Sequence, residues 1–209
     1  MRRITLFFLL SSFLFACVPA QPTDASQTVT IYATPAAQPW LDKLYACADS
    51  ASVILNVEPG APDILLRVGP PEGLSTPSFQ IDTEDILIVV NRTSPLQNLT
   101  IEQARVLFAG QGDPSFRVWV YPAGEDVQAV FDQAVMDGRR VVSSARVAVT
   151  PQQMSDTLNA DVTAVGILPR HWKMGTVRDV FTLPAVPVLA ITPSEPQGLV
   201  RDLIACLQK

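Results

Sequence analysis

The stretch Ile86-Leu87-Ile88-Val89-Val90-Asn91, followed by Ser94-Pro95, decides the fold of this chain. Five of the six residues in the first segment are aliphatic, and no polar residue alternates with them. This pattern predicts a strand that is covered on both faces, because a strand with one exposed face alternates apolar and polar residues. We therefore expect it to be a central strand of a sheet.

A helix is predicted soon after this strand. Asn98-Leu99-Thr100 leads into Ile101-Glu102-Gln103, and apolar residues continue at helical spacing to Phe108-Ala109-Gly110. Thr100 and Gln103 form a capping box if Thr100 is the N-cap residue, and Gly110 can end the helix.

Strand and helix patterns alternate along the rest of the chain from Thr28. The predicted strands cover residues 28–33, 52–57, 63–68, 86–91, 116–121, 146–149, 162–168 and 186–191. The predicted helices cover residues 40–47, 101–108, 125–136 and 197–207, and a further one begins at Thr150-Pro151-Gln152-Gln153. Such alternation predicts an α/β fold with mostly parallel sheets.

The first 16 residues have the features of a bacterial export signal. Arg2 and Arg3 precede a short apolar core that is too short to span a bilayer. Leu14-Phe15-Ala16-Cys17 resembles the lipobox of bacterial lipoproteins, in which the cysteine receives a lipid and becomes the new N-terminus. We expect lipidation at Cys17; a secretory signal followed by a free thiol is the alternative.

Residues 17–27 are small, polar and proline-bearing, which predicts a flexible tether after the lipidated cysteine. Cleavage before Cys17 removes Arg2 and Arg3 and no acidic residue, so 13 basic residues remain against 20 acidic ones, a net charge of −7. We therefore expect no binding to nucleic acid and no membrane contact other than through the lipid. The predicted location is extracytoplasmic and lipid-anchored.

Two further cysteines, Cys47 and Cys206, lie in predicted helices near the two ends of the folded part. An exported protein can keep a disulfide, and a bridge here would join the two ends of the fold. Two separate buried thiols are the alternative, because spacing alone does not fix the pairing.

These segments resemble the phosphate-type periplasmic substrate-binding proteins of ABC importers. The likeness runs from Thr28 to the end and rests mainly on residues 86–110. Val165-Gly166-Ile167-Leu168-Pro169 resembles the family's Gly-Tyr-Val-Pro crossover, with Ile in place of Tyr, and Ala61-Pro62-Asp63-Ile64 resembles the approach to its third strand.

The resemblance implies a two-lobed, type II periplasmic-binding-protein-like fold in which each lobe is a mostly parallel sheet flanked by helices. Residues 28–86 and 168–209 would form lobe I, and residues 87–167 would form lobe II. The lobes would be joined by crossing strands near Ile86 and Ile167, with a ligand held between them.

In lobe I, the resemblance points to Thr34, Arg67 and Gly69 as candidate ligand-binding residues. Thr34 offers a hydroxyl after the first strand, where the family places Ser or Thr, although it could equally be a turn residue. The family continues its third strand into Ser-Ser-Arg, whereas this chain has Arg67-Val68-Gly69. Arg67 offers a bidentate fork to an oxyanion if it does not face solvent.

In lobe II, the family's Ser-Gly-Thr loop appears as Ala123-Gly124-Glu125-Asp126. Gly124 is retained, and we interpret Glu125 and Asp126 as first-turn acids that satisfy the N–H groups of their own helix. Their negative charge would repel phosphate. Ser143 and Ser144 are candidates for substitute hydroxyl groups, although adjacent serines are common in turns.

Enzymatic activity is not expected. His171 is the only histidine, and no nucleophile elbow, Walker loop or dinucleotide fingerprint occurs. We expect no metal and no cofactor, and interpret Glu84-Asp85, like Glu125-Asp126, as solvated ends of elements.

The sequence thus predicts a monomeric solute-binding lipoprotein that captures a small molecule, with anions among the candidates, for an ABC permease. The alternative is a related domain that has lost transport and acts as a sensor or interaction module.

Overall fold

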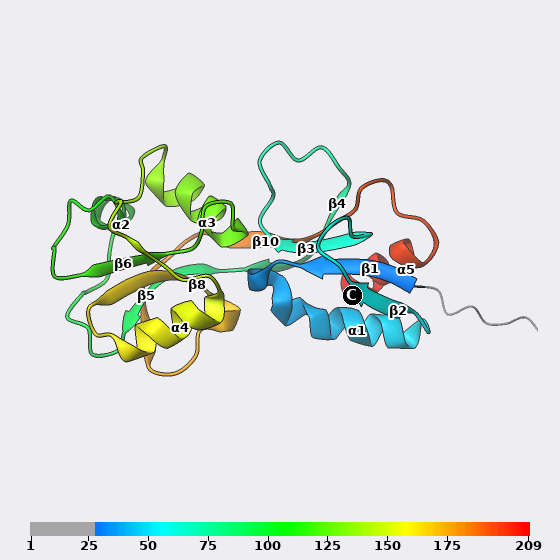
Figure 1. Cartoon of the computed structure of the whole chain (residues 1–209), viewed down its shortest axis with the longest axis horizontal. Coiled ribbons are helices and arrows are strands. Elements are labelled where there is room, and N and C mark those ends of the chain that lie inside the picture. The colour runs from blue at the N-terminus through cyan, green and yellow to red at the C-terminus, as the bar shows by residue number, and fades with distance from the viewer. Residues whose placement is uncertain (1–27) are drawn as a thin grey trace, which may run out of the picture.

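The computed structural model describes residues 28–209, whose strands form two five-stranded sheets (Figure 1). Sheet A has the order β2 (Ile54–Val57), β1 (Thr28–Ala33), β3 (Ile64–Val68), β10 (Val186–Ile191), β4 (Ser78–Glu84). Sheet B has the order β7 (Arg146–Val147), β6 (Arg117–Val120), β8 (Ala164–Pro169), β5 (Ile86–Asn91), β9 (Val177–Thr182). The predicted signal peptide (residues 1–16), Cys17 and the predicted tether to residue 27 lie outside the described residues.

Four strands of each sheet run in one direction and the fifth runs against them. In sheet A, β1 is parallel to β2 and β3, whereas β10 is antiparallel to β3 and β4. In sheet B, β6 is parallel to β7 and β8, whereas β5 is antiparallel to β8 and β9. The predicted α/β class with mostly parallel sheets is confirmed.

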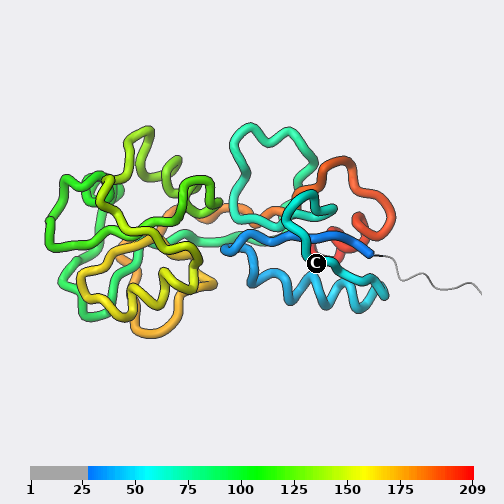
Figure 2. Tube along the Cα trace, viewed as in Figure 1, coloured from blue at the N-terminus to red at the C-terminus, as the bar shows by residue number. Residues whose placement is uncertain are grey.

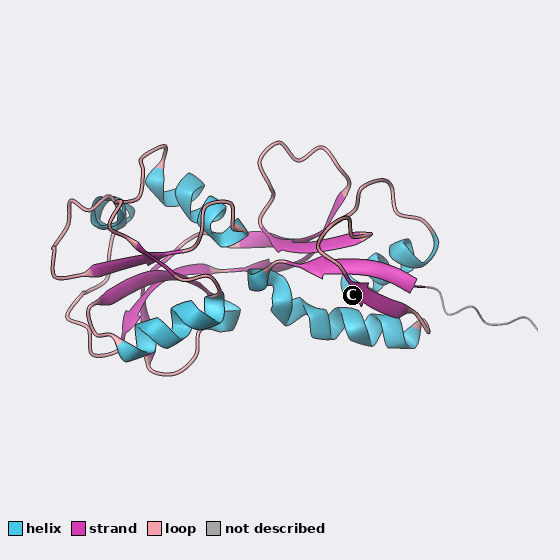
Figure 3. Cartoon of the chain, in the orientation of Figure 1, coloured by secondary structure: helices cyan, strands magenta, loops and turns pink. Residues whose placement is uncertain are grey.

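Helices flank both sheets (Figure 3). Lobe I consists of sheet A with η1 (Pro35–Trp40), α1 (Leu41–Ser50) and α5 (Gly198–Leu207). Lobe II consists of sheet B with α2 (Ile101–Phe108), α3 (Asp126–Phe131), η2 (Asp132–Met136), α4 (Pro151–Ala160) and η3 (Arg170–Trp172). The predicted helix over 125–136 is divided, because its second half, η2, is a π-helix that ends at Asp137 in a left-handed conformation with φ 49°.

The segment from Ile86 to Gly110 forms the predicted strand and helix. All six residues of β5 are buried, and β5 lies between β8 and β9 inside sheet B. The Thr100 side chain accepts a hydrogen bond from the backbone N of Gln103 at 3.2 Å, and the Thr100 N donates to Oε1 of Gln103 at 2.8 Å. The central strand and the capping box are therefore both confirmed.

The chain passes between the sheets twice (Figure 2). One residue, Asp85, links β4 to β5, and residues 183–185 link β9 to β10. The first link lies next to the predicted crossing at Ile86. The expected second crossing near Ile167 is wrong, because β8 stays in sheet B and the chain returns through η3 and β9 before it leaves. Lobe II therefore extends past residue 167 to Thr182.

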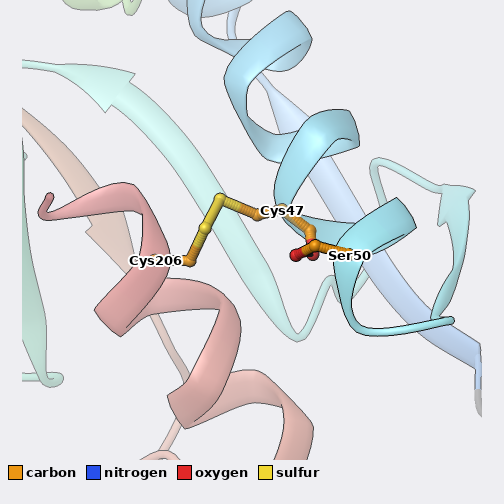
Figure 4. Close-up of a disulfide and its surroundings, with 3 residues drawn as sticks. All are labelled: Cys47, Ser50 and Cys206. Carbon is orange, nitrogen blue, oxygen red and sulfur yellow. Dashed lines mark hydrogen bonds between the residues drawn. A yellow bond between two sulfur atoms is a disulfide. The ribbon is translucent and has the colours of Figure 1, made fainter.

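A disulfide joins α1 to α5 within lobe I. Cys47 and Cys206 are bonded with their Cα atoms 6.0 Å apart (Figure 4). Leu44 and Ala48 beside the first cysteine and Leu203 and Leu207 beside the second are buried in the core. The bridge therefore holds the first and last helices of the fold together.

Candidate functional site

The carboxylate of Asp126 connects the two lobes. Asp126 is the first residue of α3 in lobe II, and only 2% of its surface is exposed. Its Oδ2 accepts hydrogen bonds from Thr34 Oγ1 at 2.5 Å and from the backbone N of Val68 at 2.9 Å, both in lobe I. Its Oδ1 accepts from the backbone N of Val127 at 2.8 Å.

The two donors from lobe I lie together because of the sheet topology. β1 and β3 are adjacent and parallel, with Ala33 opposite Leu66. Thr34 follows the end of β1, and Val68 is the last residue of β3. Since the carboxyl ends of parallel strands meet at one edge of a sheet, the hydroxyl and the N–H face the same point. Asp126 occupies that point.

Arg67 and Glu125 flank this contact. Arg67 is half-buried, and its Nε donates to the Gly69 carbonyl oxygen at 2.9 Å. Burial lowers the pKa of Arg67, an effect that the negative charges of Asp126 and Glu125 oppose. Burial, and then the charge of Asp126, raises the pKa of Glu125, whereas Arg67 lowers it. The candidate residues Arg67 and Glu125 therefore both lie at the interface between the lobes.

Gly69 permits the lobes to approach closely. Its φ is +73°, a conformation that side-chain-bearing residues rarely adopt, and its N donates to the Pro187 carbonyl oxygen at 2.8 Å. A Cβ atom at this position would lie 2.6 Å from Cγ2 of Val130, on α3 of lobe II. The role of Gly69 is therefore steric, at the contact between β3 and α3.

Tyr121, just after β6, is the polar residue at this interface that sequence reasoning missed. It is 4% exposed, and its hydroxyl has no hydrogen-bond partner among the described residues. Burial, followed by the charges of Asp126 and Glu125, raises the pKa of Tyr121 well above its usual value. Its hydroxyl therefore remains protonated at neutral pH.

The space around Asp126 and Tyr121 is filled. The residues that line it come from both lobes: Pro35, Ala36, Tyr121, Glu125, Asp126, Val127, Val149 and Pro151. No volume accessible to a water molecule remains between them. The contact between the lobes is closed at this point.

An open groove of about 870 Å³ lies beside the closed contact. Lobe I contributes Pro70, Pro71, Glu72 and Gly73, and lobe II contributes the exposed Gly124 and part of α3 and η2, including Asp132. Burial raises the pKa of Asp132. The hydrogen bond that its carboxylate accepts from Gln128, at 2.8 Å, opposes part of this increase. The ionisable groups that line the groove, Glu72 and Asp132, are both acidic.

Ser143 and Ser144 lie elsewhere. Both are exposed and precede β7, and Ser144 lines a pocket of about 330 Å³ together with Gly110, Arg117 and Arg146. Arg117 is the first residue of β6, so this pocket lies at the amino ends of the strands. The structure therefore does not bring these serines to the contact between the lobes.

A second interlobe contact surrounds the link at Asp85. Glu84 ends β4 and is 2% exposed, so the expectation that it is a solvated end is wrong. Its Oε1 accepts from the backbone N of Asp85 and of Arg170, both at 3.0 Å, and its Oε2 lies 2.6 Å from Nδ1 of His171. The Trp172 indole also crosses to lobe I, donating to the Ala36 carbonyl oxygen at 3.1 Å.

Neither a metal cluster nor a membrane-spanning helix is present in residues 28–209. No group of three or more His, Cys, Asp or Glu side chains in this range is arranged to hold a metal ion. No helix in this range is long and apolar enough to cross a bilayer.

No protein-family model matches the sequence, and no curated protein matches it. Solved structures do match. A phosphate ABC transporter substrate-binding protein from Clostridium perfringens, solved with bound phosphate, is 13% identical with a TM-score of 0.72, covering 87% of this chain and 93% of that one. An ABC-type phosphate transport receptor from Vibrio cholerae is 18% identical with a TM-score of 0.66, at 87% and 93% coverage.

A regulatory domain is also similar in fold. The CcmR regulatory domain of Synechocystis, solved in complex with 2-PG, is 10% identical with a TM-score of 0.66, covering 87% of this chain and 96% of that one. At these identities the likeness concerns the fold alone. The two-lobed topology and these matches together show that the chain has the type II periplasmic-binding fold.

Proposed function

We propose that this chain is an extracytoplasmic, lipid-anchored binding protein that closes its two lobes over a small solute and presents it to an ABC importer. One observation carries the proposal: the lobes meet at the carboxyl ends of β1 and β3, where Thr34 and Val68 donate across the interface. The two short links between the sheets, Asp85 and residues 183–185, provide a hinge. Structural neighbours with phosphate-transport names support the same role.

The proposed solute differs from phosphate. Asp126 already accepts the hydrogen bonds that Thr34 and Val68 can donate, and Glu125 adds a second negative charge beside them. The neighbouring groove adds Glu72 and Asp132. Because like charges in a partly dehydrated site repel, an oxyanion is disfavoured there. We expect the part of the solute that enters the cleft to be neutral or cationic.

The test is a thermal-shift screen of the mature chain (residues 17–209) carrying Cys17→Ser, so that no lipid is attached. A ligand that binds only the folded state must raise the melting temperature. Amino acids, amines, sugars and oxyanions form the panel. A saturable shift with a neutral or cationic compound supports the proposal, whereas a shift with phosphate contradicts the proposed solute class.

The second candidate function is a sensor or interaction module without transport. The observation that favours it is the closed contact itself, which Asp126 completes without any solute. The match to a regulatory domain is compatible with such a role. A cooperative melt with no shift across the whole panel would favour this module over the receptor.

The proposed anchor is tested separately. In cells given radiolabelled palmitate, the wild-type chain should incorporate label and sediment with membranes. The Cys17→Ser variant should do neither. Label that persists in the variant would contradict lipidation at Cys17.

A further inference from the structure

We propose that Asp126 is an intramolecular ligand: its carboxylate occupies an anion-binding position on lobe I, holds the lobes together without solute and excludes external oxyanions. This inference concerns the closed state of the chain itself. It does not require that a solute or an importer be identified.

The first argument is the set of donors. Both groups on lobe I that contact the carboxylate are neutral, an O–H of Thr34 at 2.5 Å and the N–H of Val68 at 2.9 Å. Neutral donors that converge on one oxygen at the carboxyl ends of strands suit any small oxyanion. Asp126 makes no ion pair within residues 28–209. Lobe I therefore binds this carboxylate as it would bind a free anion.

The second argument is burial. Asp126 is 2% exposed, and an ionised carboxylate out of water is stable only when its oxygens are hydrogen-bonded. Separation of the lobes breaks the bonds to Thr34 and Val68 and leaves only the bond to Val127, within lobe II. The two bonds to lobe I therefore exist only in the closed state, and their loss opposes opening.

The third argument is the unused donor at the same place. Tyr121 lines the closed space with Asp126 and is 4% exposed, and its hydroxyl has no partner among the described residues. A buried hydroxyl without a partner is rare in folded proteins. The closed contact therefore contains one buried donor that the carboxylate of Asp126 does not use.

External anions are excluded because the carboxylate of Asp126 is covalently part of the chain. A group attached to the chain competes at a high effective concentration with any free ligand for the same donors. Glu125, adjacent in sequence, contributes a second negative charge. Free phosphate must therefore displace the carboxylate and also approach Glu125.

Chemical rescue tests the inference. Asp126→Ala removes the carboxylate but retains Cβ, so formate supplies the missing group. In the mature Cys17→Ser chain, Asp126→Ala should lower the melting temperature, and millimolar formate should restore about 2–4 °C of the loss. Formate should not shift the parent chain, where the position is occupied.

The matched control is Asp132→Ala. Asp132 is an exposed acid six residues after Asp126 in the same helical segment, and its carboxylate accepts a hydrogen bond from Gln128 within lobe II. Formate should not rescue this variant. Equal rescue of both variants, or no rescue of Asp126→Ala, would overturn the inference.

Small-angle X-ray scattering supplies a second readout. The parent chain should have the radius of gyration of the closed form without any added ligand, and Asp126→Ala should expand until formate is added. If Asp126→Ala does not fold, Thr34→Val tests the same contact by removing one donor. Thr34→Val should also expand the chain, and an unchanged radius of gyration in that variant would overturn the inference.

Discussion

Oε2 of the buried Glu84 lies 2.6 Å from Nδ1 of His171, and this pair joins the end of β4 in lobe I to η3 in lobe II. The His171 ring also stacks at an angle on the Trp40 ring, with centroids 4.6 Å apart. The Trp40 indole in turn donates to Asp82 at 2.9 Å. The only histidine of the chain is therefore part of the packing around the interlobe link.

Replacement of His171 should destabilise the fold although the ring is partly exposed. Without the imidazole, one oxygen of a carboxylate that is 2% exposed loses its partner, and an unsatisfied buried polar group costs about 1–3 kcal/mol. His171→Ala should therefore lower the free energy of unfolding by about that amount in urea denaturation. In the background of Glu84→Ala the same substitution should cost much less, and equal costs in the two backgrounds would contradict the pairing.

Because of Glu84, the free energy of unfolding should fall as the pH rises above about 4.5, the usual pKa of a glutamate. Burial raises its pKa, an effect that His171 opposes by favouring the charged form. The folded state therefore holds the proton of Glu84 more tightly than the unfolded state does. The resulting stabilisation is complete below the pKa that Glu84 has in the unfolded chain, and it is lost as the pH rises through the higher pKa of the folded chain. Denaturation between pH 4 and pH 7 should show the parent chain losing stability relative to Glu84→Gln. A constant difference between the two chains would contradict the raised pKa.

Loss of the disulfide should weaken lobe I strongly. Cys47 and Cys206 are 159 residues apart, and removal of a native disulfide typically costs about 2–5 kcal/mol, with long loops at the upper end. Cys47→Ala/Cys206→Ala should therefore reduce the free energy of unfolding within that range. Hydrogen exchange should show the largest loss of protection in α1 and α5. Reducing agent should reproduce the effect in the parent chain and leave the double variant unchanged.

The fully buried strands are the part of the fold that the sequence indicates most clearly. β5 and β8 are buried along their whole length, so their residues form continuous apolar runs that are easy to recognise. β4 and β9 were missed because charged residues such as Asp82 and Asp179 interrupt their apolar pattern. Without β9, the second link was placed one strand too early.

The site was predicted only in part, for a different reason. Thr34, Arg67 and Gly69 were named from the family resemblance, and they lie at or beside the contact between the lobes. Asp126 was interpreted as a first-turn acid, and one of its oxygens does bond to its own helix. Its other oxygen bonds to Thr34, 92 residues away in sequence, and only the assembled lobes bring such groups together. Nothing in the local pattern indicates that contact.

The close approach of the lobes at Gly69 is testable with three glycines. Gly69→Ala should be strongly destabilising, because the new Cβ atom would lie 2.6 Å from Val130 and the residue has φ +73°. Gly124→Ala controls for backbone conformation alone, since its φ is +95° and nothing lies within 4 Å of an added Cβ. Gly60→Ala, also free of neighbours, should be nearly neutral.

We expect Gly69→Ala to cost at least about 1 kcal/mol more than Gly124→Ala in urea denaturation. Val130→Ala should recover part of that difference, because it removes the atom that the new Cβ meets, and equal costs for Gly69→Ala and Gly124→Ala would show that the lobes are not in close contact there.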